Sequence, residues 1–573
     1  MAGWASCRRR LLRRALAAAS CVFAIALLPS ALQGFPASER AALGVGLQAH
    51  IDSLEAGSCR KEWGKVVRAA AAFVEEGKPE RAEALLSEAL DRSPDHPQLL
   101  EASAELHLRQ GRLAEAEAVA THLTRIRPES DYGWELLAAS RYLQDDPHGA
   151  LRAWERSRPP VVRDIEIRIL GHSGSRAPGS GADPVRMTGI RADRPLTVEG
   201  LVRGERRLVA LPAAARVRVG YQALSGGEAA IQGTVVLRAK HPFAGSELVA
   251  HALRLLSGRV DIVTADPLGR FERWELSGTV EGTLRRAGLV LAHPALLGFG
   301  VWRWEVDHEV GRYGSTLLGE AAREARTGIG WSHTDWVAGV LRGTIHGRLD
   351  LRPGRGTFAG AGMGWTLLSL SARSSVGAKA TGWTGIGQEA AEREGPGNES
   401  RFGRMEIRAS LLPSPSPSFG AAPSGVGARL GVVAVSSGLP PDLMPRIGAG
   451  GTTSLLMRAR SDLDGEGVVR PLFPGTAWAH GGIELVRPVG SVGPVGIGIA
   501  AFADGVGVLL PDRRLSDPAA RKAAVHLGAG VRARIAGVDG FLRVDGGIDP
   551  SDGASTLSMA WVQEHPLNGL LAH

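Results

Sequence analysis

Two short segments carry residue types that catalysis uses, and neither has the spacing of a known active site. Gly171-His172-Ser173-Gly174-Ser175 lacks the final glycine of a nucleophile elbow, in which a strained turn presents a reactive serine. His308-Glu309 has no second histidine four residues after the first, so it cannot form the zinc-protease helix. The 16 histidines are scattered along the chain. We therefore expect no catalytic residue, no metal site and no cofactor.

Charged residues recur instead at every second position in five segments of the C-terminal half, at 273–285, 301–307, 341–351, 405–411 and 531–535. Successive side chains of a β-strand point to opposite faces, so each segment is predicted to be a strand with one polar face. In the first segment the residues expected on that face are Arg273, Glu275, Ser277, Thr279, Glu281, Thr283 and Arg285. These segments therefore predict a sheet with one charged face.

Strands of about 10 residues with one apolar and one polar face are typical of a transmembrane β-barrel, whose lumen is wet. Lipid supplies no hydrogen-bond partners, so a spanning sheet must close on itself. Residues 259–562 give room for about 16 such strands. The alternative is a soluble β-sandwich whose apolar faces pack against each other, and periodicity alone does not separate the two.

The N-terminal 34 residues indicate export. Five arginines precede an apolar run, Ala15 to Leu28, and small residues follow, which is typical of a secretory signal peptide. No later segment has 18 or more uninterrupted apolar residues, so no transmembrane helix is expected after the signal.

Cys59 would then be the single cysteine of the mature chain, which excludes an intramolecular disulfide. The net charge of +8 is spread along the chain, which argues against a nucleic-acid partner.

Between residues 63 and 160 the chain repeats with a period of 34 residues. Two registers define this repeat, with members Gly77, Gly111, Asp145 and Ala82, Ala116, Ala150. Small residues where paired helices touch, and Pro94 and Pro128 after the second helix of a unit, are the tetratricopeptide pattern. Three helical hairpins are predicted. They would serve either as a concave peptide-binding surface or as a short rigid spacer.

From 161 to about 242 the pattern changes to strand, helix, strand, strand. Asp164–Leu170 or Arg186–Ala192 is the opening strand, Thr197–Leu211 a helix, and Val217–Leu224 and Ala230–Ala239 a hairpin turning at Gly226-Gly227. The segments 208–212, 216–221, 227–229 and 235–238 resemble a POTRA domain. Such domains precede the barrel in the outer-membrane assembly and secretion superfamily that includes BamA, TamA and the two-partner-secretion transporters. The resemblance implies exposed strand edges that pair with an extended client.

Two later motifs extend this resemblance to most of the mature chain. The segment 450–460 is similar to the superfamily's long inward loop, and Arg458 matches its motif arginine, although Ala459 and Arg460 stand where a glycine and an aromatic residue are usual. The segment 502–507 is similar to an F-x-D-x-G motif on a later strand, with its glycine displaced by one position. The resemblance implies an ion pair in the lumen between Arg458 and Asp504. A fixed guanidinium–carboxylate pair would hold the loop.

Other positions support or compete with this assignment. The supporting motif positions are Gly451, Phe502, Gly505 and Glu484. Arg470 is the alternative arginine for the loop tip. Both residues of the proposed pair would otherwise belong simply to the charged lining, where ion pairs contribute about 0–1 kcal/mol. In the last strand, Leu557, Met559 and Trp561 are expected to share one face.

The sequence thus predicts a multidomain chain with an α-helical tetratricopeptide solenoid, a small α+β POTRA-like domain and a C-terminal antiparallel transmembrane β-barrel. The predicted parts are a signal peptide at 1–34, a lead-in at 35–62, helical hairpins at 63–160, the POTRA-like domain at 161–242, the barrel at 259–562 and an extension at 563–573. The expected location is the bacterial outer membrane, with the first two domains as a periplasmic arm.

The expected function is that of a protein-assembly or translocation barrel, without enzymatic activity. Its partners would be unfolded or extended client proteins, outer-membrane lipid and periplasmic accessory proteins at the repeats. The alternative is a passive porin or structural barrel with a tethering arm.

Overall fold

The computed structural model of the protein divides into two compact units, residues 1–127 and 128–573. The residues that the structure describes are 63–171, 183–238, 255, 258–296, 298–314, 321–369, 373–386, 400–413, 423–436, 439–448, 455–456, 462–470, 473, 475–511, 522–535 and 541–562. The predicted signal peptide, the lead-in and the C-terminal extension lie outside these ranges.

The first unit is helical where it is described. A helix at 63–75 is followed by α3 (Pro79–Arg92), α4 (Pro97–Arg109) and α5 (Leu113–Ile126). Proline at the first position of α3 and α4 fits a helix start, because that amide has no intrahelical acceptor. The two glycines of the repeat register, Gly77 and Gly111, adopt left-handed backbone angles between successive helices.

The second unit begins with α6 (Asp131–Leu143) and α7 (Pro147–Trp154). Asp145 occupies the third glycine position of the repeat and also has a positive φ, 63°. The alanines of the other register, Ala82, Ala116 and Ala150, are fully buried. Each 34-residue repeat therefore contains one left-handed turn residue and one buried alanine. The prediction of tetratricopeptide-type hairpins is confirmed.

A small α+β domain follows, with elements β1 (Val161–Leu170), α8 (Pro184–Thr188), α9 (Val198–Val209), β2 (Ala214–Leu224) and β3 (Glu228–Leu237). The sheet order is β1-β3-β2, with β1 parallel and β2 antiparallel to β3. The first alternative for the opening strand is thus right. The second, Arg186–Ala192, is wrong, because Asp183 caps α8 there by accepting a hydrogen bond from the Val185 amide.

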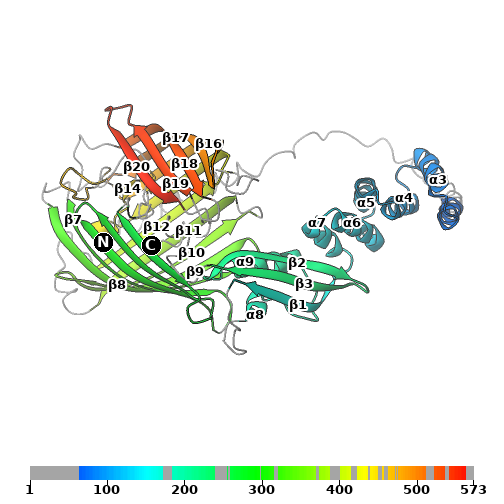
Figure 1. Ribbon diagram of the computed structural model, residues 1–573, viewed down its shortest axis with the longest axis horizontal. Coiled ribbons are helices and arrows are strands. Elements are labelled where there is room, and N and C mark those ends of the chain that lie inside the picture. Colours follow the sequence, from blue (N-terminus) through cyan, green and yellow to red (C-terminus); the bar gives the residue numbers. More distant parts are fainter. Residues whose placement is uncertain are drawn as a thin grey trace, which may run out of the picture. The chain divides into compact units, whose positions relative to one another are not determined.

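The C-terminal part is one antiparallel sheet of 15 strands, curled as Figure 1 shows. Its strands are β4 (Arg259–Ala265), β5 (Arg273–Glu281), β6 (Leu284–Pro294), β7 (Val301–Gly314), β8 (Ala321–Trp336), β9 (Leu341–Arg352), β10 (Gly356–Leu368), β11 (Ser374–Ile386), β12 (Arg401–Leu411), β13 (Gly425–Val435), β16 (Ala477–Val492), β17 (Val495–Leu510), β18 (Ala523–Ile535), β19 (Phe541–Ile548) and β20 (Ser555–Val562). Each of these strands pairs with the next one named, and within the described residues no ladder joins β4 to β20. Between β13 and β16, the short strands β14 (Ile447–Gly448) and β15 (Leu455–Leu456) form a separate parallel pair.

The antiparallel barrel class is confirmed, with 15 described strands against about 16 expected. The β-sandwich alternative is wrong, because one continuous ladder leaves its apolar face exposed. Ile329, Ile345 and Met363, for example, are 55%, 49% and 69% exposed. In the described part of the chain, no helix is both long and apolar enough to span a membrane.

One predicted strand, 273–285, is in fact two. β5 ends at Glu281, Gly282 takes a φ of +58°, and β6 starts at Leu284. The two-residue turn shifts the alternation by one position, so Leu284 is buried and Arg285 is exposed on the opposite face from Glu281. The expectation that Arg285 shares the charged face is therefore wrong.

Candidate functional site

The inner face of the sheet is the one against which the long segment between β13 and β16 lies. On β7, β8 and β9 this face carries acidic and basic side chains that are largely buried, including Asp307, Arg326 and Asp350. The intervening residues on the other face are apolar and exposed, such as Val306 and Leu349. The predicted alternation at 301–307 and 341–351 is thus confirmed, and it builds a charged inner wall.

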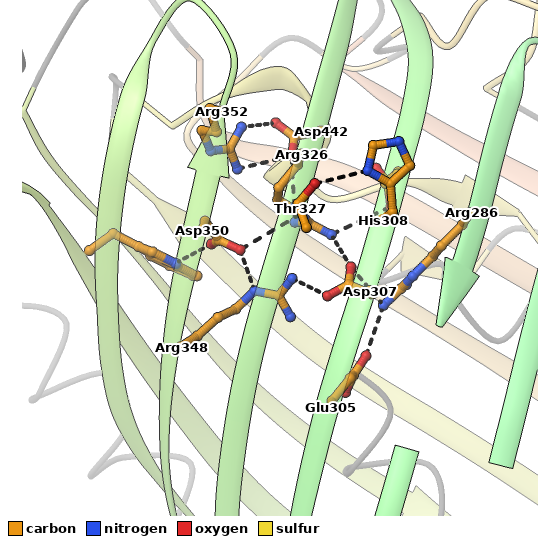
Figure 2. A network of polar contacts seen from close by, with 12 residues as sticks. Arg286, Glu305, Asp307, His308, Arg326, Thr327, Arg348, Asp350, Arg352 and Asp442 are labelled. Carbon is orange, nitrogen blue, oxygen red and sulfur yellow. Dashed lines mark hydrogen bonds and ion pairs between the residues drawn. The ribbon is translucent and has the colours of Figure 1, made fainter. Parts of the chain in front are cut away.

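Ion pairs link three neighbouring strands of this wall (Figure 2). The Asp307 carboxylate accepts hydrogen bonds from Arg348 and, at 3.2 Å, from Nη2 of Arg326. Arg348 also donates from Nε to Asp350 at 2.5 Å. Trp383 of β11 donates to the other oxygen of Asp350 at 3.2 Å. Each buried charge therefore has an opposite charge or a donor beside it, as burial requires.

The segment after β13 contributes one carboxylate to this network. A short 3₁₀ turn, η1 (Pro441–Leu443), places Asp442 against Arg352, which donates from both terminal nitrogens at 2.6 and 2.9 Å (Figure 2). Arg326 lies 3.5 Å from the same carboxylate. The side chains of Asp442 and Arg352 are 3% and 1% exposed. This bidentate, desolvated pair fixes the segment to β9.

A second set of contacts fixes the same segment to β5 and β7. Arg446 donates to both oxygens of Asp462, at 3.0 and 2.9 Å, and lies 3.5 Å from Glu281 at the end of β5. The Val469 carbonyl accepts from the Gly314 amide at 2.8 Å. Gly467 accepts from both the amide and the hydroxyl of Thr283. The described parts of 436–476 therefore form an inward loop that is bound to one side of the barrel wall.

Glycine is required where this loop meets the β5–β6 turn. A side chain at Gly282 would place its Cβ 2.7 Å from the Gly467 backbone, and both residues have positive φ values, +58° and +73°. Two glycines thus let two backbones approach closely in a conformation that other residues rarely adopt.

A separate ionic cluster lies on β16, β18 and β19. The fully buried Arg532 side chain donates to Glu484 at 2.6 Å and to Asp545 at 2.5 Å. Nε of Arg543 lies 3.0 Å from the other oxygen of Asp545 and forms an ion pair with it. Glu484, a predicted supporting position, is thus part of the inner wall.

The structure describes one residue of the predicted ion pair. Asp504 on β17 is 1% exposed, on the same face as Phe502, and is paired in the ladder with Gly482 and His526. Gly505 falls on the opposite, outer face. Arg458 and Gly451 lie outside the described residues, so the Arg458–Asp504 pair stays a prediction. The alternative, Arg470, instead donates to Asp464 at 2.6 Å within the loop.

Sequence reasoning identified Arg348 and Asp350 as members of a charged face but missed Arg352, Asp442 and Arg446 as the residues that hold the loop. Asp442 follows Pro440-Pro441, which signals a turn and not a charge partner. Its partner Arg352 is 90 residues away in sequence, a separation that local patterns do not bridge.

The small α+β domain is joined to the barrel through α9. Arg207 donates from Nε and Nη2 to the Asp335 carboxylate at 3.0 and 2.8 Å, and its guanidinium lies 3.9 Å from the centre of the Phe299 ring. Arg206 donates to the Ser369 carbonyl at 2.7 Å and lies over the Trp336 ring. Phe299, Asp335, Trp336 and Ser369 lie at or next to turns of the barrel, so these turns are at the end that faces the small domain. This end is the arm-side end of the barrel.

The two parts also share apolar contacts. Phe271 and Ala265, at the β4–β5 turn, belong to the same buried cluster as Met187, Leu208 and Val235 of the small domain. Among the described residues no group of three or more histidine, cysteine, aspartate or glutamate side chains is placed to hold a metal ion.

These features define a class: a chain with tetratricopeptide repeats, a small α+β domain and a C-terminal antiparallel β-barrel whose lumen holds an inward loop. The tetratricopeptide repeat family model matches residues 73–139. No curated protein matches the chain.

Similar solved structures include two that cover most of this chain and one that covers a short part of it. BamA from Haemophilus ducreyi lacking POTRA domains 1–3 has 12% sequence identity and a TM-score of 0.37, over 70% of this chain and 85% of that one. CdiB from Escherichia coli has 13% identity and a TM-score of 0.45, over 75% and 83% of the two chains. The globular C-terminal domain of P. aeruginosa LpoP has 32% identity and a TM-score of 0.16, over 16% of this chain and 92% of that one.

Proposed function

We propose that this protein is an outer-membrane barrel that captures extended client chains through its arm and inserts them into the membrane or passes them across it. The arm consists of the tetratricopeptide hairpins and the small α+β domain, and it lies in the periplasm. The barrel works without catalytic chemistry.

The surface of the sheet supports a membrane location. Large apolar side chains are exposed on the outer face of nearly every strand, from Leu276 on β5 to Leu557 on β20. Exposing such a surface to water costs a free energy of about 25 cal/mol per Å² of apolar area. Contact with lipid acyl chains avoids this cost. A charged inner face and an apolar outer face are what a spanning barrel requires.

The observation that carries the proposal is the inward loop bound by buried ion pairs. Asp442–Arg352 and Arg446–Glu281 hold the loop against β9 and β5 from within the lumen, and Arg446–Asp462 joins two parts of the loop itself. A loop held in this way obstructs a passive pore, whereas a transporter needs a plug that it displaces only when a client is present. We propose Arg458–Asp504 as a further anchor on the opposite wall.

The arm offers a site for an extended client. β2 is an edge strand of the small domain and pairs, within the described residues, with β3 alone. An unpaired edge adds an extended peptide by main-chain hydrogen bonds. The repeats would bind accessory proteins. Since no nucleotide is available in the periplasm, the free energy comes from client folding and apolar burial.

The ends of the ladder offer a route into the membrane. β4 and β20 are the two terminal strands of the described sheet, and no described hydrogen bonds join them. We propose that this seam opens sideways and pairs with client strands.

The alternative is a passive porin, which the density of charge on the inner wall favours, because water-filled channels are lined in this way. Conductance separates the two functions. A porin gives a steady large conductance in single-channel recordings, and a plugged transporter gives a small, flickering one.

The test compares the wild type with Asp442→Asn in planar bilayers and in vesicles with a labelled client. Removing one charge of the Asp442–Arg352 pair should cost about 3–5 kcal/mol, because Arg352 is left buried without its partner. We expect the loop to be released and the mean conductance to rise several-fold. The matched control is Asp464→Asn, whose pair with Arg470 is partly exposed and should matter by about 0–1 kcal/mol.

Two results would contradict the proposal. One is a wild-type conductance that is already large and steady and does not change in Asp442→Asn. The other is client insertion or passage no faster in vesicles with the protein than in empty vesicles.

A further inference from the structure

Three arginines stand on the outer face of the barrel at the end away from the arm. Arg285 on β6, Arg312 on β7 and Arg323 on β8 are all exposed. Their strand neighbours Arg286, Tyr313 and Glu324 point to the inner face, where they pair or are buried. Arg285 faces outward only because of the two-residue turn at Gly282-Thr283.

The arrangement of these charges is unfavourable by itself. Arg312 and Arg323 are direct partners in the β7–β8 ladder, and Arg285 is paired with Val310, the outward neighbour of Arg312. Like charges opposite each other on one face destabilise a sheet. The acidic residues of the same strand ends, Glu281, Glu309 and Glu324, have partners on the inner face.

Within the described part of the chain, none of the three guanidiniums takes part in a hydrogen bond or an ion pair. Their exposure leaves all three free to bind a ligand from outside. A cluster of guanidiniums with no carboxylate among them is suited to a phosphate, whose oxygens accept paired N–H donors.

The three arginines lie at one border of the apolar outer face, and tryptophans lie at the opposite border. Trp274, Trp304 and Trp331 belong to one ladder row across β5–β8, Trp304 and Trp331 being direct partners, and Trp302 stacks on Trp304 with ring centres 6.1 Å apart. This row is near the arm-side end, since the Leu296 carbonyl of the adjoining turn accepts from Arg186 of α8. Tryptophan prefers the level of the lipid headgroups.

The separation of the two borders fits a bilayer. Eight to ten residues separate Trp304 and Trp302 from Arg312 along β7. At about 3.3 Å per residue and a strand tilt of about 40°, this corresponds to roughly 20–25 Å across the membrane. The apolar band of barrels of this type is about 25 Å tall. The arginines therefore lie at the headgroup level of the leaflet opposite the arm.

We propose that Arg285, Arg312 and Arg323 form a binding site for the phosphate of an anionic lipid headgroup in the leaflet away from the arm. The lipid neutralises the three facing charges and holds β6–β8 at a fixed depth. The ligand is a lipid and not free phosphate, because the site borders the apolar band where acyl chains lie. The inference rests on the membrane-spanning part of the proposed function and is independent of client transport.

The test uses the full-length protein in vesicles of phosphatidylcholine with a small fraction of spin-labelled phosphatidylglycerol or spin-labelled phosphatidylcholine. We expect the wild type to bind phosphatidylglycerol several-fold more strongly, with a preference that weakens as salt is added. The triple variant Arg285→Gln/Arg312→Gln/Arg323→Gln should lose most of this preference. The corresponding triple Lys variant should keep part of it, because the charge remains and the planar fork is lost.

Two controls separate the site from net charge. Arg152→Gln/Arg191→Gln/Arg194→Gln removes three exposed arginines from the helices and the small domain and should leave the preference unchanged. Arg401→Gln removes a single outward arginine from the start of β12, away from the cluster, and should have little effect. Circular dichroism and heat-modifiable gel mobility show that each variant is folded.

Equal binding of the two lipids by the wild type, or an unchanged preference in the Gln triple variant, would overturn the proposal. Full competition by millimolar inorganic phosphate would assign the site to the free anion and overturn the lipid source. Failure of the wild type to insert into vesicles would contradict the proposed function, whereas insertion without lipid preference would contradict this inference alone.

Discussion

At the scale of single residues, the barrel wall and its inward loop contain buried charges that must be paired. Arg352, Arg532 and Asp307 have side chains that are almost completely buried, and each has an opposite charge within hydrogen-bond distance. Unpaired, any one of them would cost several kcal/mol. Such residues are therefore sensitive positions for both loop placement and barrel stability.

The proposed Arg458–Asp504 pair is tested by a double-mutant cycle. Arg458→Ala and Asp504→Ala should each release the loop, and the double variant should be little worse than either, giving a coupling free energy of about 1–3 kcal/mol. The measurement is the single-channel conductance together with the free energy of unfolding. Arg470→Ala with Asp504→Ala is the control and should be additive, because Arg470 bonds to Asp464. The reverse pattern would assign Arg470 to the loop tip.

Glu205 on α9 gives the arm a pH dependence. Burial raises the pKa of its carboxyl above the ordinary 4.5, and the nearby charges of His148 and Arg206 oppose this only in part. The native state therefore holds the proton more tightly than the unfolded state. Stability from this group is fully present below the unfolded pKa and is lost as pH rises through the folded pKa.

Glu205→Gln should consequently slow amide hydrogen exchange in α9 and β3 of the full-length protein at pH 7, with no difference from the wild type near pH 4. Glu199→Gln, at an exposed position on the same helix, is the control and should change neither value. Faster exchange in Glu205→Gln at pH 7 would show that the carboxylate stabilises the arm.

At the scale of elements, the β5–β6 turn does two things. It reverses the chain in two residues, and it provides the surface on which the inward loop rests through Gly467. The turn also decides which face Arg285 occupies. A change there is expected to affect the loop and the strand pair together.

Gly282→Ala should destabilise the protein by about 2–4 kcal/mol, because it adds a clash with the Gly467 backbone to the strain of a positive φ. Gly493→Ala is the matched control, because Gly493 has a φ of +57° in another hairpin turn and an added Cβ there would meet open space. It should cost about 1 kcal/mol from strain alone. Thermal unfolding in detergent gives both values, and equal losses would mean that the loop contact contributes nothing.

At the scale of the second unit, the small domain is fixed to the arm-side turns of the barrel by charge and by a shared apolar cluster. Arg207 contacts Asp335 and Phe299, and Phe271 packs against Leu208 and neighbours. We therefore expect the small domain and the barrel to move as one body.

Arg207→Gln should loosen this joint, because the bidentate bond and the ring contact are both lost. The measurement is the distance distribution between spin labels at Leu224→Cys and Leu268→Cys, in a background in which Cys7, Cys21 and Cys59 are replaced by serine. This distribution should broaden. Arg203→Gln removes a 3.2 Å contact to the Val337 carbonyl and is the control, with little broadening expected. An unchanged distribution in Arg207→Gln would mean that the apolar cluster alone holds the joint.

The sequence by itself determined the class of each element, because the relevant signals are local. A period of two predicted strands with one charged face, and a period of 34 predicted helical hairpins whose register residues are the left-handed turn positions Gly77, Gly111 and Asp145. Backbone geometry repeats over a few residues, so a pattern of the same length records it.

The tertiary structure alone decided which charges meet. Asp442 and Arg352 are 90 residues apart and are joined only when the loop enters the lumen. Arg285 lies outside and not inside, because a two-residue turn shifts the alternation by one position. Both outcomes depend on where a turn falls and how a loop folds, and a strand's own periodicity contains neither.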